Sequence, residues 1–516
     1  MEDEREKREA IQKKCQRNKI SFLLISFYSG VIAISDLGVK YYLKDEKKMN
    51  TSSFTQVLLI IKVAYLIKPL YGLLIDFLPI FGYKKKMYLL ICFFINIFSW
   101  YFFILQKNNN LLISLICQFL INITISFSTV IGSAIQVEIS RLQDKKNTIG
   151  KGTLDLMTTH FIIKSLGTLI PSYFKGSLIE KYSSDIIFYI SGFISFLLLI
   201  SGIILDEDKF KKKNKIEKKN TFHPLIKPKR EDSTNSKLSN LINNKNIMIL
   251  LILIFILESS PSCVSPLFYY ETNILGLNPQ KLGLIDFASS VAIIVFIIIY
   301  KRFFCQYNFK TITFCVRILI FGSFSLIYLL ITKSTQEYIN DYILLIFVTS
   351  LNAGLHSLGQ LPYSLICIKY SPFGLEATTY AFSVFSCYLG NIFADYIDYL
   401  LALYFNITHS DFDNLGKLVF MENLISLIPL LYVWIIPKKF FSVKSSSSQS
   451  RELSSFGEIG NEKRSNDNDN DYDIEEDNKN IIDNIMNNIV REEEIEKDSE
   501  FDLNPRRDCS YRYLNY

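Results

Sequence analysis

Histidine, cysteine and charged residues are scarce in this chain of 516 residues. It has 4 His and 9 Cys, and only 21% of its residues are charged. The cysteines are scattered, mostly within apolar runs, and no pair has the spacing of metal ligands or of a disulfide framework. The sequence also lacks a Ser-His-Asp set, an HExxH motif and a glycine-rich phosphate loop. We therefore expect neither an enzyme nor a bound metal or cofactor.

Long apolar segments dominate the sequence instead. Hydrophobic residues make up 49% of the chain and fall into runs of about 18–25, the length that crosses a hydrocarbon core of roughly 30 Å as a helix. This pattern predicts an all-α, multi-pass membrane protein with about twelve transmembrane helices. In the first half they are expected near residues 20–40, 52–78, 88–106, 111–137, 153–174 and 185–205, and in the second half near 247–270, 281–300, 310–332, 341–368, 376–404 and 418–436.

Polar segments divide these helices into two groups. Residues 206–246 are basic and too poor in apolar side chains to bury a core, and residues 438–516 have a composition typical of disorder. The expected parts are an N-terminal tail at 1–19, a six-helix bundle at 20–205, a linker at 206–246, a second six-helix bundle at 247–437 and a disordered tail at 438–516. This layout resembles the major facilitator fold, in which two pseudo-symmetric halves enclose a site near the membrane midplane.

The distribution of Lys and Arg predicts the orientation of the chain. Basic residues crowd the N-terminal tail, residues 84–86, residues 141–151, the linker and residues 301–310, while most alternate loops are poorer in them. The positive-inside rule then places both termini in the cytosol, although residues 44–48 go against the trend. Topology explains the positive charge, so we expect lipid contact and no nucleic-acid partner. The expected location is the plasma membrane, with an organelle membrane as the alternative.

The stretch from residue 62 to 88 carries charges inside an apolar run. A charge at bilayer depth costs about 2.5–3.5 kcal/mol, so such residues normally face a protein interior or a water-filled path. We hypothesise a gate in which Gly72 allows close helix approach and Asp76 pairs with a basic cluster or with the N-terminus of another helix. The cluster consists of Lys84, Lys85 and Lys86. The alternative is that it only anchors topology.

Other charged side chains are candidates for contact with a substrate or coupling ion. Lys68, beside Pro69, can pair with an organic anion. His160 and Lys164 lie four residues apart and so share a helix face, which makes Lys164 a second anion contact. Histidine titrates near neutrality, so His160 is a candidate proton carrier, with a hydrogen-bonded interior histidine as the alternative.

Further candidates lie in both halves. Asp36 is one of them, although Lys40 on the next turn can simply neutralise it. In the second half, Glu258 lies well inside an apolar run, and the guanidinium of Arg317 has a geometry that fits a carboxylate. The remaining titratable groups expected at or near membrane depth are Asp286, His356, Asp395 and Asp398.

Four motifs resemble those of the folate–biopterin transporter family. The first is YYLKD at residues 41–45, and the second is the pattern IKPLYG-x-x-x-D-x-x-P-x-x-GY with its basic cluster at residues 67–86. In the second half, a Pro-Ser and Phe-Tyr-Tyr pattern falls within residues 261–270, and a motif with Pro, Gly, Glu, Ala and Thr occupies residues 372–378. The resemblance spans residues 28–436.

The sequence departs from the family pattern at the end of the fourth helix. That pattern is approximately D-V-x-x-D-A-x-x-V-E, and this chain has Thr129 and Ser133 in place of the two aspartates. Glu138 remains at the glutamate position, and the resemblance makes it a candidate coupling residue. If the missing carboxylates carry protons or bind substrate in relatives, this chain couples or selects differently.

The resemblance implies a secondary active transporter of folates, pterins or a related small organic anion. Such a protein works by alternating access, and proton coupling is the accompanying hypothesis. One alternative keeps the fold and changes the cargo to another metabolite, such as an amino acid or a nucleoside. The other is a membrane receptor or scaffold without transport, whose tails bind partners.

Overall fold

The computed structural model of this chain describes residues 2–107, 109–146, 151–182, 184–207, 209, 243–305, 307, 309–334, 338–371, 375–408 and 411–435. The chain divides into two units, residues 1–441 and 442–516, and every described residue belongs to the first. The predicted disordered tail and most of the predicted linker lie outside the described residues. So do Pro372 and Gly374 of the fourth family motif.

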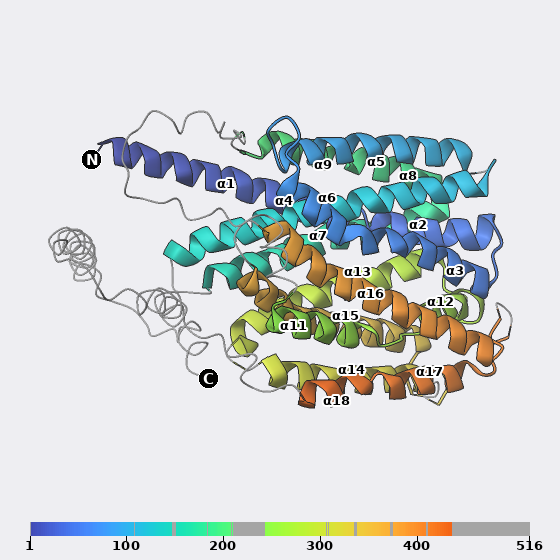
Figure 1. Ribbon diagram of the computed structural model, residues 1–516. Helices are drawn as coiled ribbons and strands as arrows, with labels where there is room; N and C mark the ends of the chain where they lie inside the picture. The colour runs from blue at the N-terminus through green and yellow to red at the C-terminus, as the bar shows by residue number, and fades with distance from the viewer. Residues whose placement is uncertain are drawn as a thin grey trace. The chain divides into compact units, whose positions relative to one another are not determined.

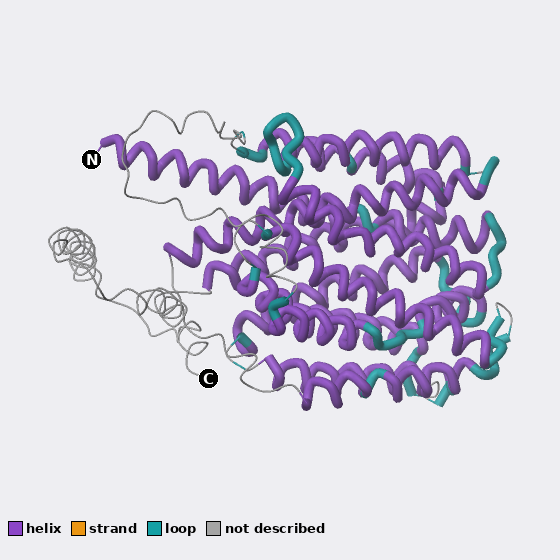
Figure 2. The backbone as a smooth tube through the Cα atoms, viewed as in Figure 1, coloured by secondary structure: helices purple, strands orange, loops and turns teal. Residues whose placement is uncertain are grey.

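Within the described residues the regular structure is helical, apart from an isolated bridge between Ile80 and Tyr83 (Figure 2). The helices of the first half are α1 Glu2–Val31, α2 Ile34–Tyr41, α3 Thr51–Lys62, α4 Lys68–Phe77, α5 Lys86–Gln106, α6 Leu111–Lys146, α7 Lys151–Tyr182, α8 Asp185–Ile194 and α9 Phe196–Ile204. Those of the second half are α11 Lys245–Glu258, α12 Val264–Asn273, α13 Pro279–Ile299, α14 Phe309–Ile331, α15 Asp341–Tyr370, α16 Glu376–Tyr404, α17 Leu415–Ile425 and α18 Ile428–Ile435. Because α1 begins at Glu2, most of the charged residues expected as a tail continue the first helix.

The prediction of an all-α, multi-pass membrane protein is confirmed. Among the described residues, nine helical segments are long and apolar enough to cross a membrane. The long helices α7 and α16 fall outside that group because they carry more polar side chains. With 32 and 29 residues, each still exceeds the roughly 30 Å hydrocarbon thickness at about 1.5 Å per residue. The exact number of twelve passes stays a prediction.

Several of the expected transmembrane helices are interrupted, and two of these breaks lie beside charged residues singled out from the sequence. In the second pass a 3-10 turn, Val63–Ile67, separates α3 from α4, and Pro69 occupies the first turn of α4. In the seventh pass α11 ends at Glu258 and α12 begins after Cys263, whose φ of 52° lies in the left-handed region. Non-helical backbone at membrane depth is tolerated only inside protein or beside a cavity, so both breaks mark interior positions.

The two halves of the helical bundle meet along shared seams. Figure 1 shows helices α1–α9, in blue to green, beside helices α11–α18, in yellow-green to orange. The helix axes are roughly aligned with one another. Across the boundary, α7 packs against α13 and α4 packs against α16. We call the end of the bundle where α4 ends and α5 begins the N-terminal face, because α1 also starts there, and the other end the opposite face (Figure 1).

Side-chain hydrogen bonds fix the helices locally. At the opposite face, α3, α13 and α15 each begin after an asparagine whose side-chain oxygen accepts a bond from a backbone N–H of the first turn. These caps are Asn50, Asn278 and Asn340. Inside the first half, the buried Asn96 amide donates to Thr124 Oγ1 at 2.5 Å and accepts from Ser195 Oγ at 2.5 Å. Interhelical hydrogen bonds of this kind join α5 to its neighbours inside the bundle.

Candidate functional site

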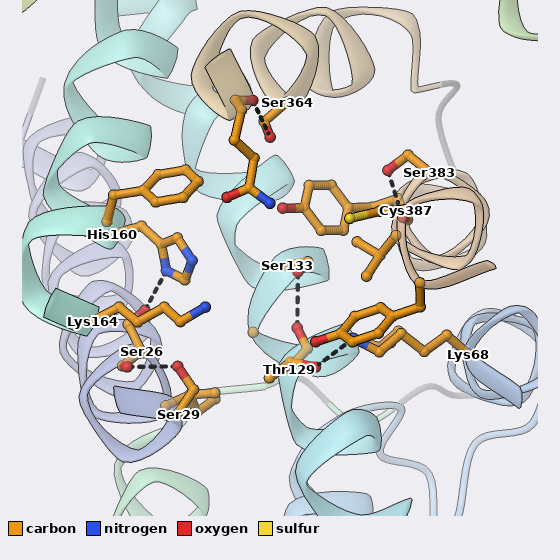
Figure 3. Close-up of a pocket in the computed structure, with 18 of the residues that line it drawn as sticks. Ser26, Ser29, Lys68, Thr129, Ser133, His160, Lys164, Ser364, Ser383 and Cys387 are labelled. Carbon is orange, nitrogen blue, oxygen red and sulfur yellow. Dashed lines mark hydrogen bonds between the residues drawn. The ribbon is translucent and has the colours of Figure 1, made fainter. Parts of the chain in front are cut away.

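A cavity of about 200 Å³ lies between the two halves (Figure 3). It is bounded by α1, α4, α6 and α7 from the first half and by α15 and α16 from the second. Its polar lining includes Ser26, Ser29, Lys68, Thr129, Ser133, His160, Lys164, His356, Gln360, Tyr363, Tyr380 and Cys387. Both halves therefore contribute side chains to one interior site.

Lys68 reaches the cavity from the first turn of α4, directly after the 3-10 turn. Its Nζ lies 3.3 Å from Thr129 Oγ1 and 4.5 Å from the ring centre of Tyr388. A second ring, that of Tyr65, is 5.3 Å away and stacks on Tyr388 at 4.4 Å. Aromatic faces attract a cation but do not neutralise it. These contacts of the ammonium group include no carboxylate.

His160 and Lys164 form the facing wall, one turn apart on α7 (Figure 3). The His160 Nδ1 and Ser26 Oγ are hydrogen-bonded at 2.7 Å, and the imidazole stacks on Phe22 at 5.4 Å. The Lys164 side chain is exposed to the cavity and extends into it from the side opposite Lys68 (Figure 3). No carboxylate among the described residues lies within ion-pair distance of Lys68 or Lys164.

A buried carboxylate lies directly behind the second-half wall. Glu258, at the end of α11, is only 6% exposed. It accepts a hydrogen bond from Tyr363 at 2.8 Å and contacts His356 Nε2 at 3.1 Å. Arg317 on α14 donates to the Leu257 carbonyl and to Ser260 Oγ, so it holds the chain at the same helix break. His356 and Tyr363 both line the cavity, and they connect Glu258 to it.

The chemistry of this cavity suits a flat, anionic solute. Two ammonium groups project into it from opposite sides, and Phe161, Tyr380 and Tyr388 supply aromatic wall. Hydroxyl and amide side chains provide hydrogen bonds that fix orientation, as in most small-molecule sites. No metal-ligand cluster occurs among the described residues that line the cavity.

Contacts across the halves bridge the N-terminal face. The Asp76 carboxylate at the end of α4 accepts hydrogen bonds from the backbone N–H of Thr378 at 2.8 Å and from its hydroxyl at 2.6 Å. Arg141 on α6 pairs with Glu376 in the first turn of α16. Lys301 pairs with Asp155 at 2.8 Å. These contacts hold α4, α6 and α7 against the second half.

The basic cluster at the same face does not form an ion pair with the Asp76 carboxylate. Lys84, Lys85 and Lys86 instead donate their backbone N–H groups to the Glu207 carboxylate, at 2.9, 3.0 and 3.1 Å. The Lys85 side chain pairs with Glu138 on α6, and the Lys84 ammonium donates to the backbone oxygen of Asp76 at 3.1 Å. The cluster therefore ties the loop before α5 to the end of the sixth pass and to α6.

Other contacts bridge the halves toward the opposite face. Lys62 at the end of α3 pairs with Asp395 on α16, and Lys175 on α7 pairs with Asp286 on α13. The backbones of α7 and α13 also meet closely at Gly176. Charged or polar contacts thus join the two halves on both sides of the cavity.

The structure divides the site candidates from the sequence into four groups. Lys68, His160 and Lys164 line the cavity, and Glu258 and Arg317 lie behind its wall. Asp36 and Glu138 are not among the lining residues. Asp36 interacts electrostatically with Lys175 and Lys40, and Glu138 pairs with Lys85. The gate candidates Gly72, Asp76 and Lys84–Lys86 lie at or near the N-terminal face.

Other relevant residues gave little sequence signal. Thr378 belongs to the fourth family motif, but nothing in the sequence links it to Asp76. Tyr380 and Tyr388 are ordinary residues of an apolar helix, and only the fold places them in the cavity wall. The departure from the family pattern offered one clue. Thr129 and Ser133 both line the cavity, and Thr129 is the residue next to the Lys68 ammonium.

Known proteins resemble this chain over most of its length. The model of the BT1 family matches residues 29–454. Folate transporter 1 of Plasmodium falciparum is 30% identical over 430 residues, covering 81% of this chain and 79% of that protein. A folate-biopterin transporter of Synechocystis sp. is 25% identical over 426 residues, covering 81% of each.

Two solved structures share the fold at low identity. The nucleoside transporter NupG is 14% identical, with a TM-score of 0.54, and the match covers 83% of this chain and 100% of that one. A D-xylose-proton symporter is 12% identical, with a TM-score of 0.57, and the match covers 83% and 98%. The fold is thus that of the major facilitator transporters, and these relatives are named as transporters. This chain is a multi-pass transmembrane transporter, and it belongs to the BT1 family.

Proposed function

We infer that this chain carries folates, pterins or related small organic anions by alternating access. The observation that carries the proposal is the pair Lys68 and Lys164, which face one cavity without a carboxylate partner among the described residues. An ammonium group at membrane depth is costly unless an opposite charge or water accompanies it. An anionic substrate supplies that charge.

The aromatic wall supports the choice of substrate class. A folate combines a flat heteroaromatic ring with carboxylates, so it can use both features of the cavity. Tyr388 lines the cavity with Lys68 above its ring at 4.5 Å, and Tyr380 lies two turns earlier on the same helix. The relatives named as folate and folate-biopterin transporters agree with this assignment.

The contacts on either side of the cavity support alternating access between the halves, residues 20–205 and 247–437. Opening toward the N-terminal face requires that Asp76 release Thr378 and that Arg141 release Glu376. Opening toward the opposite face requires that the ion pairs at Lys62 and Lys175 break. Each set can be broken while the other persists, so the two act as gates.

Proton coupling is part of the proposal. His356 faces the cavity and contacts Glu258, so a proton can be exchanged between a substrate-facing imidazole and a buried carboxylate. His160 offers a second imidazole beside Lys164. Protonation of either histidine adds a positive charge to the cavity and favours an anion. Proton and anion would then move together.

The orientation and location follow from the loop charges. We place both termini and the linker, residues 206–246, in the cytosol because the basic clusters gather at the N-terminal face. That face carries Lys84–Lys86 and Arg141. The plasma membrane is the proposed location.

A second candidate keeps the mechanism and changes the anion. The neutral Thr129 leaves Lys68 unneutralised at a position where the family pattern has an aspartate. The cavity is therefore more positive than that pattern implies. This difference favours a solute with more negative charge than a pterin.

Uptake of labelled folate into vesicles that contain the chain tests the proposal. We expect saturable uptake that competing folates and pterins reduce, while nucleosides and neutral amino acids do not. Lys68→Gln and Lys164→Gln should each raise the KM about tenfold or more, because a hydrogen bond to a charged group contributes about 1.5–3 kcal/mol. Lys417→Gln is the control, since Lys417 is exposed and bonds only to Asn414 on its own helix among the described residues. Uptake that is absent, or unchanged in both cavity variants, contradicts the proposal.

A further inference from the structure

Two buried carboxyl groups meet away from the cavity, in the half of the bundle near the opposite face. Asp398 on α16 and Glu422 on α17 are each only 3% exposed. One carboxyl oxygen of each acid and the Cys263 sulfur all lie within 4.8 Å of one another. Neither acid forms an ion pair with a basic residue in the part of the chain that the structure describes.

The hydrogen-bonding of this pair is incomplete without a proton. Asp398 Oδ1 and Glu422 Oε1 are both buried, and neither has a hydrogen-bond partner among the described residues. Two ionised carboxylates offer only acceptors to each other, and their mutual repulsion forbids double ionisation at short range. A single proton between them supplies the missing donor and removes one charge.

The surroundings fit a proton better than a metal ion. Asp398 faces the backbone N–H of Ser265 and Glu422 faces that of Cys263, both at the start of α12. These donors can stabilise the one remaining negative charge. The third group is a thiol, a poor ligand for Na⁺, Mg²⁺ or Ca²⁺, which prefer oxygen.

The charges around the pair connect it to the boundary between the halves. Asp395 lies one turn before Asp398 on α16 and pairs with Lys62 of the first half. Among the described residues, Glu271 of α12 also acts electrostatically on Cys263. Along α16, Tyr388 and Asn391 line the cavity and Asp395 and Asp398 follow at helical spacing. One helix thus joins the cavity, the ion pair and the carboxyl pair.

We propose that Asp398 and Glu422 form a proton-binding site that couples proton release to the movement of the two halves. When the halves part at the opposite face, Lys62 leaves Asp395, and an unpaired carboxylate then lies one turn from Asp398. The added negative charge favours the protonated pair, and restoring the ion pair favours proton release. This coupling role rests on the proposed transport function, whereas proton binding by the pair does not.

Infrared difference spectra of the purified full-length chain, taken between acidic and alkaline buffer, test proton binding directly. The wild type should show the carbonyl band of a protonated buried carboxyl, and the double variant Asp398→Asn with Glu422→Gln should lack it. The amide side chains match the acids in shape and can bond to each other, so the variant should fold. Glu180→Gln, at an exposed position, should keep the band. A band of equal intensity in the wild type and the double variant overturns the site.

Added Zn²⁺ or Na⁺ tests the metal alternative on the same samples. We expect no rise in the melting temperature of the wild type beyond that of the double variant. A selective rise, with loss of the carboxyl band, would show a metal site and overturn the proton site.

Vesicles with an imposed proton gradient test the coupling role. A gradient of one pH unit can sustain about a tenfold concentration ratio of substrate for each proton carried. The double variant should lose this accumulation yet keep exchange of labelled for unlabelled substrate. Accumulation equal to that of the wild type overturns the coupling role. If no substrate is moved by the wild type, the transport function fails, and the infrared result still decides whether the pair binds a proton.

Discussion

Asp76 holds Thr378 by two hydrogen bonds that cross the boundary between the halves. The residues are 302 positions apart, and one carboxylate oxygen accepts both the backbone N–H, at 2.8 Å, and the hydroxyl, at 2.6 Å. Thr378 lies in the first turn of α16, where backbone N–H groups have no partner within the helix. The carboxylate of one half therefore caps a helix of the other. Separating the halves at this face must break the cap.

Removing this cap with Asp76→Ala should favour the conformation that is open at the N-terminal face. Hydrogen bonds to a charged group contribute about 1.5–3 kcal/mol each, so the equilibrium should shift at least about tenfold. Cys387 lines the cavity and reports the change. Its labelling by a membrane-impermeant maleimide, applied from the N-terminal face, should become faster by a similar factor.

Two further variants make this result specific. In a Cys387→Ser background the additional labelling should disappear, which separates Cys387 from the other thiols. Thr378→Val loses only the hydroxyl bond and should give a smaller acceleration than Asp76→Ala. Equal labelling of wild type and Asp76→Ala would show that the cap does not hold the face closed.

Placing a carboxylate beside Lys68 should weaken anion binding. Thr129 Oγ1 is 3.3 Å from the Lys68 ammonium, so Thr129→Asp puts an opposite charge where an anionic substrate would compete for it. We expect the KM for the anion to rise about tenfold or more, since a close ion pair away from bulk water contributes several kcal/mol. Thr129→Asn is the matched control, because it has nearly the same shape and no charge. A similar KM in both variants would show that Lys68 does not bind the anion.

Sequence patterns could predict the helices well but not their partners. Apolar runs mark a transmembrane helix directly, and the predicted stretch at 52–78 nearly coincides with α3 and α4, which run from Thr51 to Phe77. Pro69 marked the local break, because proline cannot continue the hydrogen-bonding of the preceding turn. The length of the 3-10 turn before it depends on packing and was not predictable.

Pairing between distant helices was beyond prediction for a physical reason. Asp76 was a strong candidate because a charge in an apolar run is costly, but nothing in its neighbourhood points to Thr378. Glu422 shows the same limit more sharply. No sequence pattern singled it out, and only the fold brings it to Asp398. The free-energy cost of a charged residue in an apolar run can be predicted from one sequence. The residue that it contacts depends on the tertiary arrangement.

Two glycines should have opposite effects when a methyl group is added. A Cβ at Gly72 would lie 2.8 Å from Thr378 Cα, and one at Gly176 would lie 2.2 Å from the backbone oxygen of Pro279. Both contacts cross between the halves, the first at the N-terminal face and the second toward the opposite face. Gly72→Ala should thus hinder closure at the N-terminal face, and Gly176→Ala closure at the other.

Cys387 labelling from each side of the membrane measures this difference. Gly72→Ala should accelerate labelling from the N-terminal face, and Gly176→Ala should accelerate it from the opposite face. Gly322→Ala is the control, because a Cβ there meets no atom within 4 Å. If both variants change labelling on the same side, the two faces do not close as separate gates.

The hydroxyl of Tyr363 should stabilise the buried carboxylate of Glu258. It donates a hydrogen bond at 2.8 Å to Oε1, while His356 contacts Oε2 at 3.1 Å, so Tyr363→Phe leaves one oxygen without that donor. Loss of a partner to a buried charged group costs about 1–3 kcal/mol or more, and the apparent melting temperature of the purified protein should fall accordingly. Tyr404→Phe, at a side chain that is 78% exposed, should leave it unchanged.

Adding Glu258→Gln to Tyr363→Phe should recover part of the lost stability, because the amide carries no charge that needs the hydroxyl. If the double variant were less stable than Tyr363→Phe alone, the Glu258 charge would stabilise the fold mainly through Arg317 or His356, and less through Tyr363.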